Sequence, residues 1–318
     1  MIKPLLGELT RTFGKDQLEK HRIQSVKLIF VDDGSTDNTA QQLAEAIRAG
    51  LPAVLIRLSR NFGHQKALKA GLDVATADVT AVIDADLQDP PDLIPDMLSE
   101  WREGCDVVYG LRRSRREGRV KRFCYWGAHR LIAMLSDIPL PLDSGDFCLM
   151  DRRVVTHLKS LNESVLFLRG MRAWVGFRQI GLPYDRPARV AGTTKYRLKN
   201  LYKLATDGIA SLSTRPLRLA QGLAFAYLVT SIALSMFIIS RLLFPGSNSI
   251  SPLFLITYLL ILLGNGLTCF CIYILGAYVG RGYVETKGRP QYVVMEVVSA
   301  AGLEQALEGN ADRNDQDG

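Results

Sequence analysis

The segment VTAVIDADLQDPP occupies residues 79–91. Its β-branched opening predicts a strand at Val79–Asp84, and Pro90–Pro91 stands where a helix over Asp92–Glu103 would begin. A short apolar strand, a polar turn and a helix make the repeating unit of a mostly parallel sheet. This segment therefore predicts an α/β domain.

The same alternation continues on both sides of this segment. Further strands are predicted at Val26–Asp32, Ala53–Leu58 and Asp106–Tyr109, and stretches suited to helices separate them, such as Asn38–Ala49. In sheets of this kind, ligands bind beyond the carboxyl ends of the strands. The polar residues that follow the predicted strands are therefore the candidates for a functional site.

Two carboxylates follow the strand at Val79–Asp84. Asp84 and Asp86 lie at i and i+2 in extended chain, so they point to one side and can hold a hard divalent cation, to which Gln88 adds an oxygen. Three Asp residues within six positions repel one another without a cation nearby. We expect Mg²⁺ or Mn²⁺ to be bound by Asp84, Asp86 and Gln88, and an ordinary acidic surface loop is the alternative.

A second polar turn, VDDGS at residues 31–35, follows the predicted strand Val26–Asp32. Small residues after the carboxylates permit a tight turn, so that an Asp side chain can meet the edge of a nucleotide base. A turn in which the Asp caps the following helix is the alternative. These residues alone do not separate the two interpretations.

Two long uncharged stretches lie near the C-terminus, at Leu219–Ser240 and Pro252–Gly280. Each exceeds the roughly 20 residues that a helix needs to cross a membrane, whereas buried core helices, the alternative, are usually shorter and amphipathic. The loop Leu242–Ser251 carries no charge, while basic residues flank the outer ends of the pair: Arg215, Arg218, Arg281, Lys287 and Arg289. This distribution predicts a hairpin with the large N-terminal domain in the cytoplasm.

Composition restricts the partners. The 318 residues carry a net charge of +7 with a pI near 9.2, which favours contact with an anionic lipid, membrane surface, nucleotide or nucleic acid. The basic residues flank the membrane segments instead of lining one recognition helix, which argues against nucleic acid. The five cysteines have no CxxC spacing, so neither a disulfide framework nor a zinc site is indicated.

The chain resembles a known family through blocks spread along its length. The two apolar spans follow VDDGSTDNT, LSRNFGHQKALKAGL, VIDADLQDPPDLI, SGDFCLMDRRVV and GTTKYRLKNL, and precede ETKGRPQYVV. Together these blocks resemble the dolichol-phosphate-mannose-synthase-like and bacterial polyprenyl-phosphate glycosyltransferases, inverting enzymes of the second glycosyltransferase family. The resemblance implies a GT-A fold with a Rossmann-like, mostly parallel sheet. It also implies sugar transfer from a nucleotide sugar to polyprenyl phosphate, with UDP-glucose favoured and GDP-mannose as the main alternative.

The resemblance implies an integral membrane protein, with its catalytic domain on the cytoplasmic side of a bacterial inner membrane. Amphipathic stripes near Val120–Leu135 and Leu198–Leu212 predict helices at the membrane surface, and packing on the catalytic core is the alternative, which the first stripe fits equally well. A homo-oligomer is left open. The expected parts are a catalytic domain at 1–196, a juxtamembrane helix at 197–214, a transmembrane hairpin at 215–281 and a cytoplasmic segment at 282–318 with a disordered end.

The resemblance also implies roles for single residues. The nucleotide-sugar site would comprise Asp33, Ser35, Arg60, Asn61, Gly63 and Asp84. Catalysis would involve Asp146 as a base or as a carboxylate that organises the acceptor, together with Arg112 and Lys195. The acceptor phosphate would meet Arg112, Arg122 and Arg130, because arginine holds phosphate with a fork of donors. A basic patch at the membrane surface is the alternative for these arginines, and His64 is left unassigned.

Two rival classes remain. One is a non-catalytic membrane partner derived from a transferase. The residues that argue against it are Asp84, Asp86, Arg112, Asp146 and Lys195. The other is an enzyme of the same fold with a soluble or polysaccharide acceptor. A polysaccharide synthase would need several membrane spans, so the single hairpin disfavours it.

The N-terminus departs from the family pattern. Family members open with a hydrophobic strand in the middle of the sheet, whereas this chain opens MIKPLLGELTRTFGKD, with apolar residues at helical spacing. We expect a helix near Lys3–Phe13 and a wide separation between the strands Val26–Asp32 and Val79–Asp84. The corresponding hypothesis is that the sequence starts at an internal methionine and lacks part of the pocket for the base.

Overall fold

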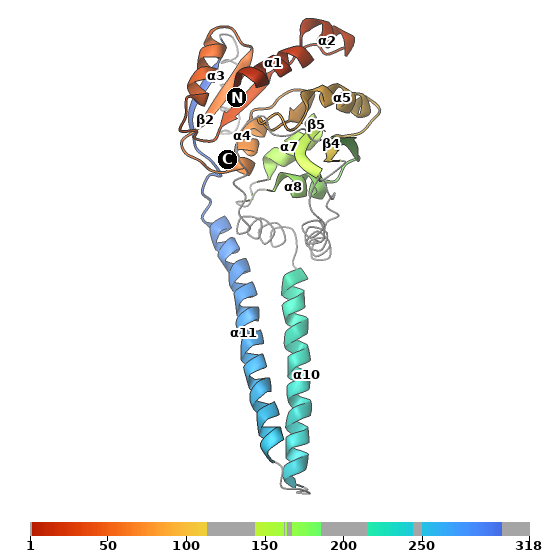
Figure 1. The fold of residues 1–318 in the computed structure, drawn as a ribbon, viewed down its shortest axis with the longest axis vertical. Helices are drawn as coiled ribbons and strands as arrows, with labels where there is room; N and C mark the ends of the chain where they lie inside the picture. The colour runs from red at the N-terminus through yellow and green to blue at the C-terminus, as the bar shows by residue number, and fades with distance from the viewer. Residues whose placement is uncertain are drawn as a thin grey trace. The chain divides into compact units, whose positions relative to one another are not determined.

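The computed structural model describes residues 2–112, 144–161, 163, 167–185, 215–243 and 250–300. These residues belong to two units, an α/β unit and a unit that holds two long apolar helices (Figure 1). The α/β unit also takes in the residues that follow the second long helix. The two units are described separately below.

The first sheet of the α/β unit has the order β1-β2-β7. β1 (Leu28–Asp32) pairs in parallel with β2 (Ala53–Leu58), and β2 pairs antiparallel with β7 (Val294–Ser299). α3 (Thr39–Arg48) buries its apolar face against this sheet, where Leu43 and Ile47 pack with residues of β2 and β7. β7 follows both apolar helices in the sequence, so the last described segment of the chain completes the first sheet.

The second sheet has the order β3-β5-β4-β6, made of β3 (Val79–Val82), β4 (Val107–Arg112), β5 (Ser144–Asp151) and β6 (Gln179–Tyr184). β5 runs antiparallel to both of its neighbours, and β4 and β6 are parallel. The prediction of an α/β fold is confirmed, but the pairing is mixed instead of mostly parallel. The direction of a strand depends on the path of the chain between strands, and the local residue pattern does not predict that path.

Helices cover both faces of the second sheet. On one face, α7 (Arg152–Ser160) and α8 (Leu168–Val175) pack over Val107, Cys148 and Met150. On the other face, η1 (Pro91–Leu93) and α5 (Ile94–Arg102) pack over alternate residues of the same strands. Because side chains alternate along each strand, the residues of this sheet belong in turn to the core under α7 and α8 and to the core under α5.

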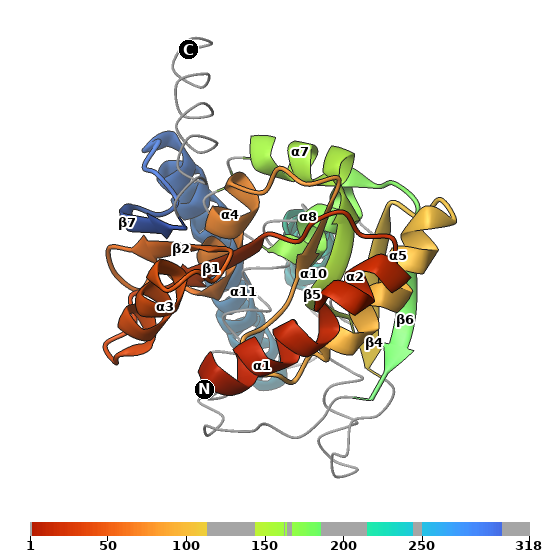
Figure 2. The same cartoon turned by 90° about the horizontal axis from the view of Figure 1, so that it is seen from above.

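α4 (His64–Asp73) connects the two sheets. Ala70 packs with Val54 and Ile56 in the core of the first sheet, while Leu72 belongs to the core of the second. In Figure 2, α4 lies between the strands of the first sheet and β5. Residues at the start of α4 can therefore reach both sheets.

The N-terminus is helical, as predicted, with α1 (Ile2–Thr12) followed by α2 (Lys15–Lys20). Leu5 and Leu9 are buried, and Thr12 donates a hydrogen bond to Asp92. Among the described strands β1 and β3 do not pair, since they belong to different sheets. This absence of pairing agrees with the separation expected between the two strands.

The second unit is a pair of helices, α10 (Arg215–Leu243) and α11 (Ile250–Thr286), which run side by side (Figure 1). Both are long and apolar enough to cross a membrane, and they contain the two predicted spans. The helices approach closely where Tyr227 faces Gly264, because a Cβ at Gly264 would lie 1.8 Å from the Tyr227 hydroxyl oxygen. Large apolar side chains such as Phe225 and Phe254 are exposed, as expected of surfaces that face lipid.

Candidate active site

The first part of the site joins the ends of β1 and β2. The Asp33 carboxylate accepts hydrogen bonds from the backbone N–H groups of Phe62 and Gly63, at 2.7 and 2.9 Å. Gly34 makes this approach feasible: its φ is +67°, and a Cβ there would lie 2.5 Å from the backbone carbon of Arg60. The VDDGS turn is therefore fastened to the loop that precedes α4.

This contact brings together five residues predicted for the donor site: Asp33, Ser35, Arg60, Asn61 and Gly63. The Ser35 N–H donates to the Asp32 carboxylate, and the Arg60 guanidinium lies 4.1 Å from the centroid of the Phe62 ring. Asp33 holds the loop in this structure, and its role toward a nucleotide base stays a prediction.

The acidic loop after β3 forms the second part. The Asp86 carboxylate accepts from the Gln88 N–H at 3.1 Å, and Leu87 between them has a φ of +57°. Asp89 is buried and accepts a hydrogen bond from the Tyr184 hydroxyl at 2.6 Å, which anchors the loop to β6. Asp89 thus stabilises the loop. Asp84 and Asp86 precede this anchor in the chain and are the two carboxylates predicted to bind a cation.

Asp84 is in an unfavourable position for a negative charge. Burial raises its pKa, and the neighbouring carboxylates of Asp89, Asp146 and Asp86 raise it further, against the opposite effect of His64. A carboxylate that is desolvated among other carboxylates would be relieved by a nearby cation. The surroundings of Asp84 are therefore compatible with a bound cation, and the cation itself stays a prediction.

The third part surrounds Asp146 on β5, whose side chain is 8% exposed. Its carboxylate lies 3.1 Å from His64 Nε2, accepts from Gln65 Nε2 at 2.9 Å and accepts from Arg169 Nε at 3.1 Å. Burial acts to raise the pKa of Asp146, but His64 and Arg169 outweigh it and hold the pKa well below its usual range. Asp146 is therefore an ionised carboxylate surrounded by donors.

His64 connects this carboxylate to the acidic loop, because its Nε2 also lies 3.7 Å from Asp84 Oδ1. The hydrogen bond to Asp146 is the main reason that the pKa of His64 is raised. His64 thus lies between the proposed cation loop and Asp146.

Gln65 and Arg169 come from α4 and α8. Besides its bond to Asp146, Gln65 accepts a hydrogen bond from the Leu168 N–H at 2.7 Å. One turn after Arg169, Arg172 is fully buried, and its guanidinium lies 4.8 Å from the centroid of the Tyr109 ring. No hydrogen-bond partner of its three guanidinium nitrogens occurs in the part of the chain that the structure describes.

Sequence reasoning missed three residues of this cluster: His64, Gln65 and Arg169. His64 and Gln65 stand in the LSRNFGHQKALKAGL block, so the block itself carried a signal for them. Arg169 has no such signal, because it follows Asp146 by 23 positions and joins it only through the packing of α8 on β5.

The residues present fit a divalent cation. Magnesium sites commonly take one or two protein carboxylates and complete their shell with water and substrate phosphate oxygens, which matches Asp84 and Asp86 with Gln88 beside them. Within the described ranges, no group of three or more His, Cys, Asp or Glu side chains could form a protein-only metal centre.

Four predicted residues have no described side chain. Arg112 is the last residue of β4, and its backbone pairs with Tyr184 of β6. Arg122, Arg130 and Lys195 lie outside the described residues, as do both predicted amphipathic stripes. The roles of these residues stay predictions.

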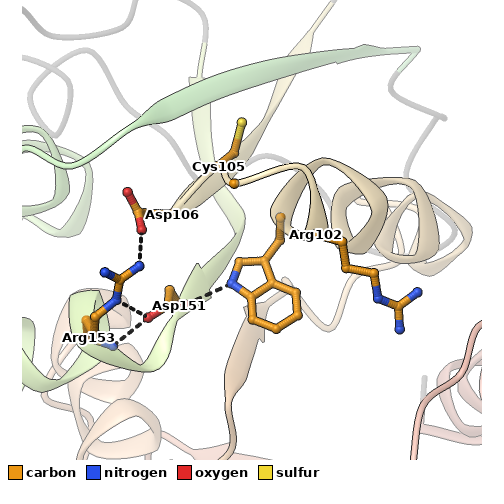
Figure 3. Close-up of a pocket in the computed structure, with 7 residues that line it drawn as sticks. Arg102, Cys105, Asp106, Asp151 and Arg153 are labelled. Carbon is orange, nitrogen blue, oxygen red and sulfur yellow. Dashed lines mark hydrogen bonds and ion pairs between the residues drawn. The ribbon is translucent and has the colours of Figure 1, made fainter.

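A separate cavity of about 390 Å³ lies near the other end of β5 (Figure 3). Three of its charged groups pair with one another: Arg153 pairs with Asp106 and Asp151, and the Trp101 indole donates to Asp151 at 2.9 Å. Asp151 also caps α7 by accepting from the Arg153 N–H. These contacts stabilise the N-terminus of α7, which gives this cluster a structural role. We therefore take the cluster around Asp84 and Asp146, at the strand ends, as the candidate active site.

Comparison with known proteins shows the family of the chain. Residues 15–158 match glycosyl transferase family 2. The chain is 40% identical over 281 residues to the uncharacterized glycosyltransferase YkcC of Bacillus subtilis, covering 86% of this chain and 84% of that protein. It is 36% identical over 286 residues to the prophage bactoprenol glucosyl transferase homolog of Escherichia coli, covering 88% and 92%. It is also 36% identical to the bactoprenol glucosyl transferase of Shigella phage SfX, covering 87% and 91%.

Proposed function

The chain belongs to glycosyl transferase family 2, and from this premise we propose that it transfers glucose from UDP-glucose to polyprenyl phosphate, with inversion at the anomeric carbon. The observation that carries the proposal is the extent of the match to relatives named bactoprenol glucosyl transferase. A match over 87–88% of this chain cannot be confined to the α/β unit, so it includes parts of the apolar hairpin.

The proposed reaction is one displacement. An oxygen of the lipid phosphate attacks the anomeric carbon, the bond from that carbon to the diphosphate breaks, and UDP leaves with the electron pair. A phosphate monoester is already ionised near neutral pH, so the attacking oxygen needs orientation and partial charge neutralisation more than a base. The residues that matter most toward the acceptor are then cations.

The donor would lie across the ends of β1 and β3. The turn with Asp33 and Ser35 and the loop Arg60–Gly63 are already fastened together, which supports a preorganised pocket for the nucleotide. We assign Asp84, Asp86 and Gln88 to a divalent cation at the diphosphate. Such a cation would stabilise the negative charge that develops on the leaving group.

The hairpin would anchor the enzyme where its acceptor is. Both helices carry large exposed apolar side chains over lengths sufficient to span a bilayer. The basic residues at the outer ends of the hairpin support a cytoplasmic location of the α/β unit, on the side where nucleotide sugars are made.

The decisive experiment uses the full chain purified in detergent. We expect a radioactive lipid when UDP-[¹⁴C]glucose, undecaprenyl phosphate and Mn²⁺ are supplied together, and none when undecaprenol replaces the phosphate. GDP-mannose and UDP-N-acetylglucosamine serve as competing donors, and EDTA tests the need for the cation. Transfer from GDP-mannose alone would correct the donor, and absence of product with every donor would contradict the function.

A further inference from the structure

The charges around Asp146 are unevenly distributed among the described residues. On the side of the loop after β3 lie the carboxylates of Asp84 and Asp86. On the side of α8 lie the guanidinium groups of Arg169 and Arg172, one helical turn apart, with Asp146 as the carboxylate that meets Arg169. The loop side therefore suits a cation, and the α8 side, where the Arg169 side chain is 34% exposed, suits an anion.

Asp146 itself is poorly arranged to take up a proton. Its two oxygens already meet three donor groups, from His64, Gln65 and Arg169, and its side chain is almost inaccessible to solvent. Each of these contacts favours the ionised carboxylate. A carboxylate so placed can fix the orientation of a neighbouring cation, because charge-assisted hydrogen bonds are strong and directional.

We propose that Arg169 is a cation of the acceptor-phosphate subsite, that Asp146 holds it there, and that Gln65 is a positioning residue for the pair. This inference rests on the proposed function, since it names residues of the same site. The Arg169 guanidinium joins Asp146 at 3.1 Å, and through Asp146 and His64 it belongs to the same contact chain as Asp84. An attacking phosphate has to be held near the donor diphosphate, and this chain of contacts connects the Arg169 guanidinium to the proposed cation loop through Asp146 and His64.

Gln65 has a distinct part in this arrangement. Its amide donates to Asp146 through Nε2 and accepts from the Leu168 N–H through Oε1, so one side chain joins the carboxylate to the residue directly before Arg169. The bond to Leu168 fixes the first turn of α8, and the bond to Asp146 fixes the group that Arg169 contacts. Gln65 can therefore set the geometry of Arg169 without contacting a substrate.

The first test is kinetic and uses the full chain in detergent. We expect Arg169→Ala to raise the KM for undecaprenyl phosphate by at least about tenfold, with the KM for UDP-glucose within about twofold of the unchanged protein. Gln65→Leu should change the lipid KM in the same direction by a smaller factor. The double variant should be no worse than Arg169→Ala alone, because Gln65 acts through Arg169.

Matched controls exist on the same chain. Arg153→Ala removes another arginine that forms ion pairs with carboxylates, those of Asp106 and Asp151. Gln41→Leu removes another glutamine side-chain hydrogen bond, which Gln41 donates to Glu45 on the exposed face of α3. Both should leave the two KM values unchanged. The inference is overturned if Arg169→Ala alters only the KM for UDP-glucose, or if Gln65→Leu and Arg169→Ala have multiplicative effects.

A binding measurement separates failure of this inference from failure of the proposed function. Farnesyl phosphate should raise the melting temperature of the unchanged protein and of Arg153→Ala, but not that of Arg169→Ala, while inorganic phosphate at the same concentration should have little effect. If the unchanged protein transfers no glucose yet shows this Arg169-dependent shift, the inference stands and the function is wrong. If it transfers glucose while Arg169→Ala retains the full shift, the inference is wrong and the function stands.

Discussion

The two ends of β5 carry similar residues in different surroundings. Near the beginning of the strand, Asp146 lies with His64 and Arg169, and Asp84 is close by. At its end, Asp151 lies with Arg153 and Trp101, roughly 16 Å away along an extended strand. Both clusters combine carboxylates, an arginine and an aromatic nitrogen, so composition does not distinguish them.

The balance of charge distinguishes the two ends. At the Asp151 end each carboxylate has its donor, and the pKa of Asp151 is lowered because the donors from Arg153 and Trp101 outweigh its burial. At the other end, burial and the carboxylates of Asp89, Asp146 and Asp86 raise the pKa of Asp84, against the opposite effect of His64. A carboxylate whose pKa is lowered on folding contributes to stability, whereas one whose pKa is raised costs stability and is a candidate for binding or chemistry.

The largest expected effect is at Asp84. We expect Asp84→Asn to lower the kcat of glucosyl transfer by about 100-fold or more, because it removes a carboxylate from the proposed cation site. The melting temperature should stay the same or rise, because the charge on Asp84 is unfavourable in the folded protein. Kinetics and calorimetry on the same preparation measure both. Normal turnover would exclude Asp84 as a ligand, and a large loss of stability would make its role structural.

Two glycines test whether the backbone of the candidate active site differs in function from the backbone near Asp151. Gly34 and Gly104 both have positive φ, but a Cβ at Gly34 would collide with the backbone of Arg60, whereas one at Gly104 would lie 3.6 Å from the Arg178 side chain. Gly34→Ala should raise the KM for UDP-glucose about tenfold and cost roughly 2–3 kcal/mol of stability. Gly104→Ala should cost about 1 kcal/mol and leave the KM unchanged. Equal effects of the two substitutions on KM would contradict the assignment of the Gly34 turn to the donor pocket.

At the satisfied end, Asp151→Ala should reduce stability by about 1–2 kcal/mol without affecting turnover, because it removes the cap of α7 and the acceptor of the Trp101 indole. The folded-state pKa of Asp151 is lowered, so its contribution is present above the pKa of the unfolded chain and is lost as the pH falls. The stability difference between the variant and the unchanged protein should therefore shrink from about pH 5 to pH 3. A difference independent of pH would show that the carboxylate charge does not contribute.

The smallest effect is expected for Arg153→Ala. The Arg153 side chain is 67% exposed, and exposed ion pairs contribute at most about 1 kcal/mol. Denaturant titration should place this variant between the unchanged protein and Asp151→Ala, with unaltered turnover. A loss of activity in this variant would show that the two ends of β5 are not functionally separate.

The sequence predicted most of the secondary structure because the signals are local. Periodicity and turn residues placed a strand at Ala53–Leu58, where the structure has it, and placed the strand at Val79–Asp84 with an error of two residues at its end. The apolar spans followed from length and lack of charge alone. The helix at the N-terminus also followed from spacing.

The sequence did not predict the role of β7. The pattern of Val294–Ser299 is that of a strand, but its partner β2 lies more than 200 positions earlier in the chain, beyond both apolar helices. Likewise, nothing local indicated that β5 would run antiparallel between β3 and β4. Pairing depends on which chain segments return to the same place, and this depends on the packing of the whole unit.

For the candidate site, the sequence by itself determined which carboxylates follow strands, because the turn after a strand is encoded within a few residues. Asp33, Asp84 and Asp86 were identified in this way. Only the tertiary structure decided that Asp146 would meet His64 82 positions away, and that Gln65 would bond to Leu168 103 positions away. The physical reason is that a short-range pattern fixes the backbone of one element, whereas a hydrogen-bonded cluster forms only where the cores under α4, α7 and α8 hold separate elements together.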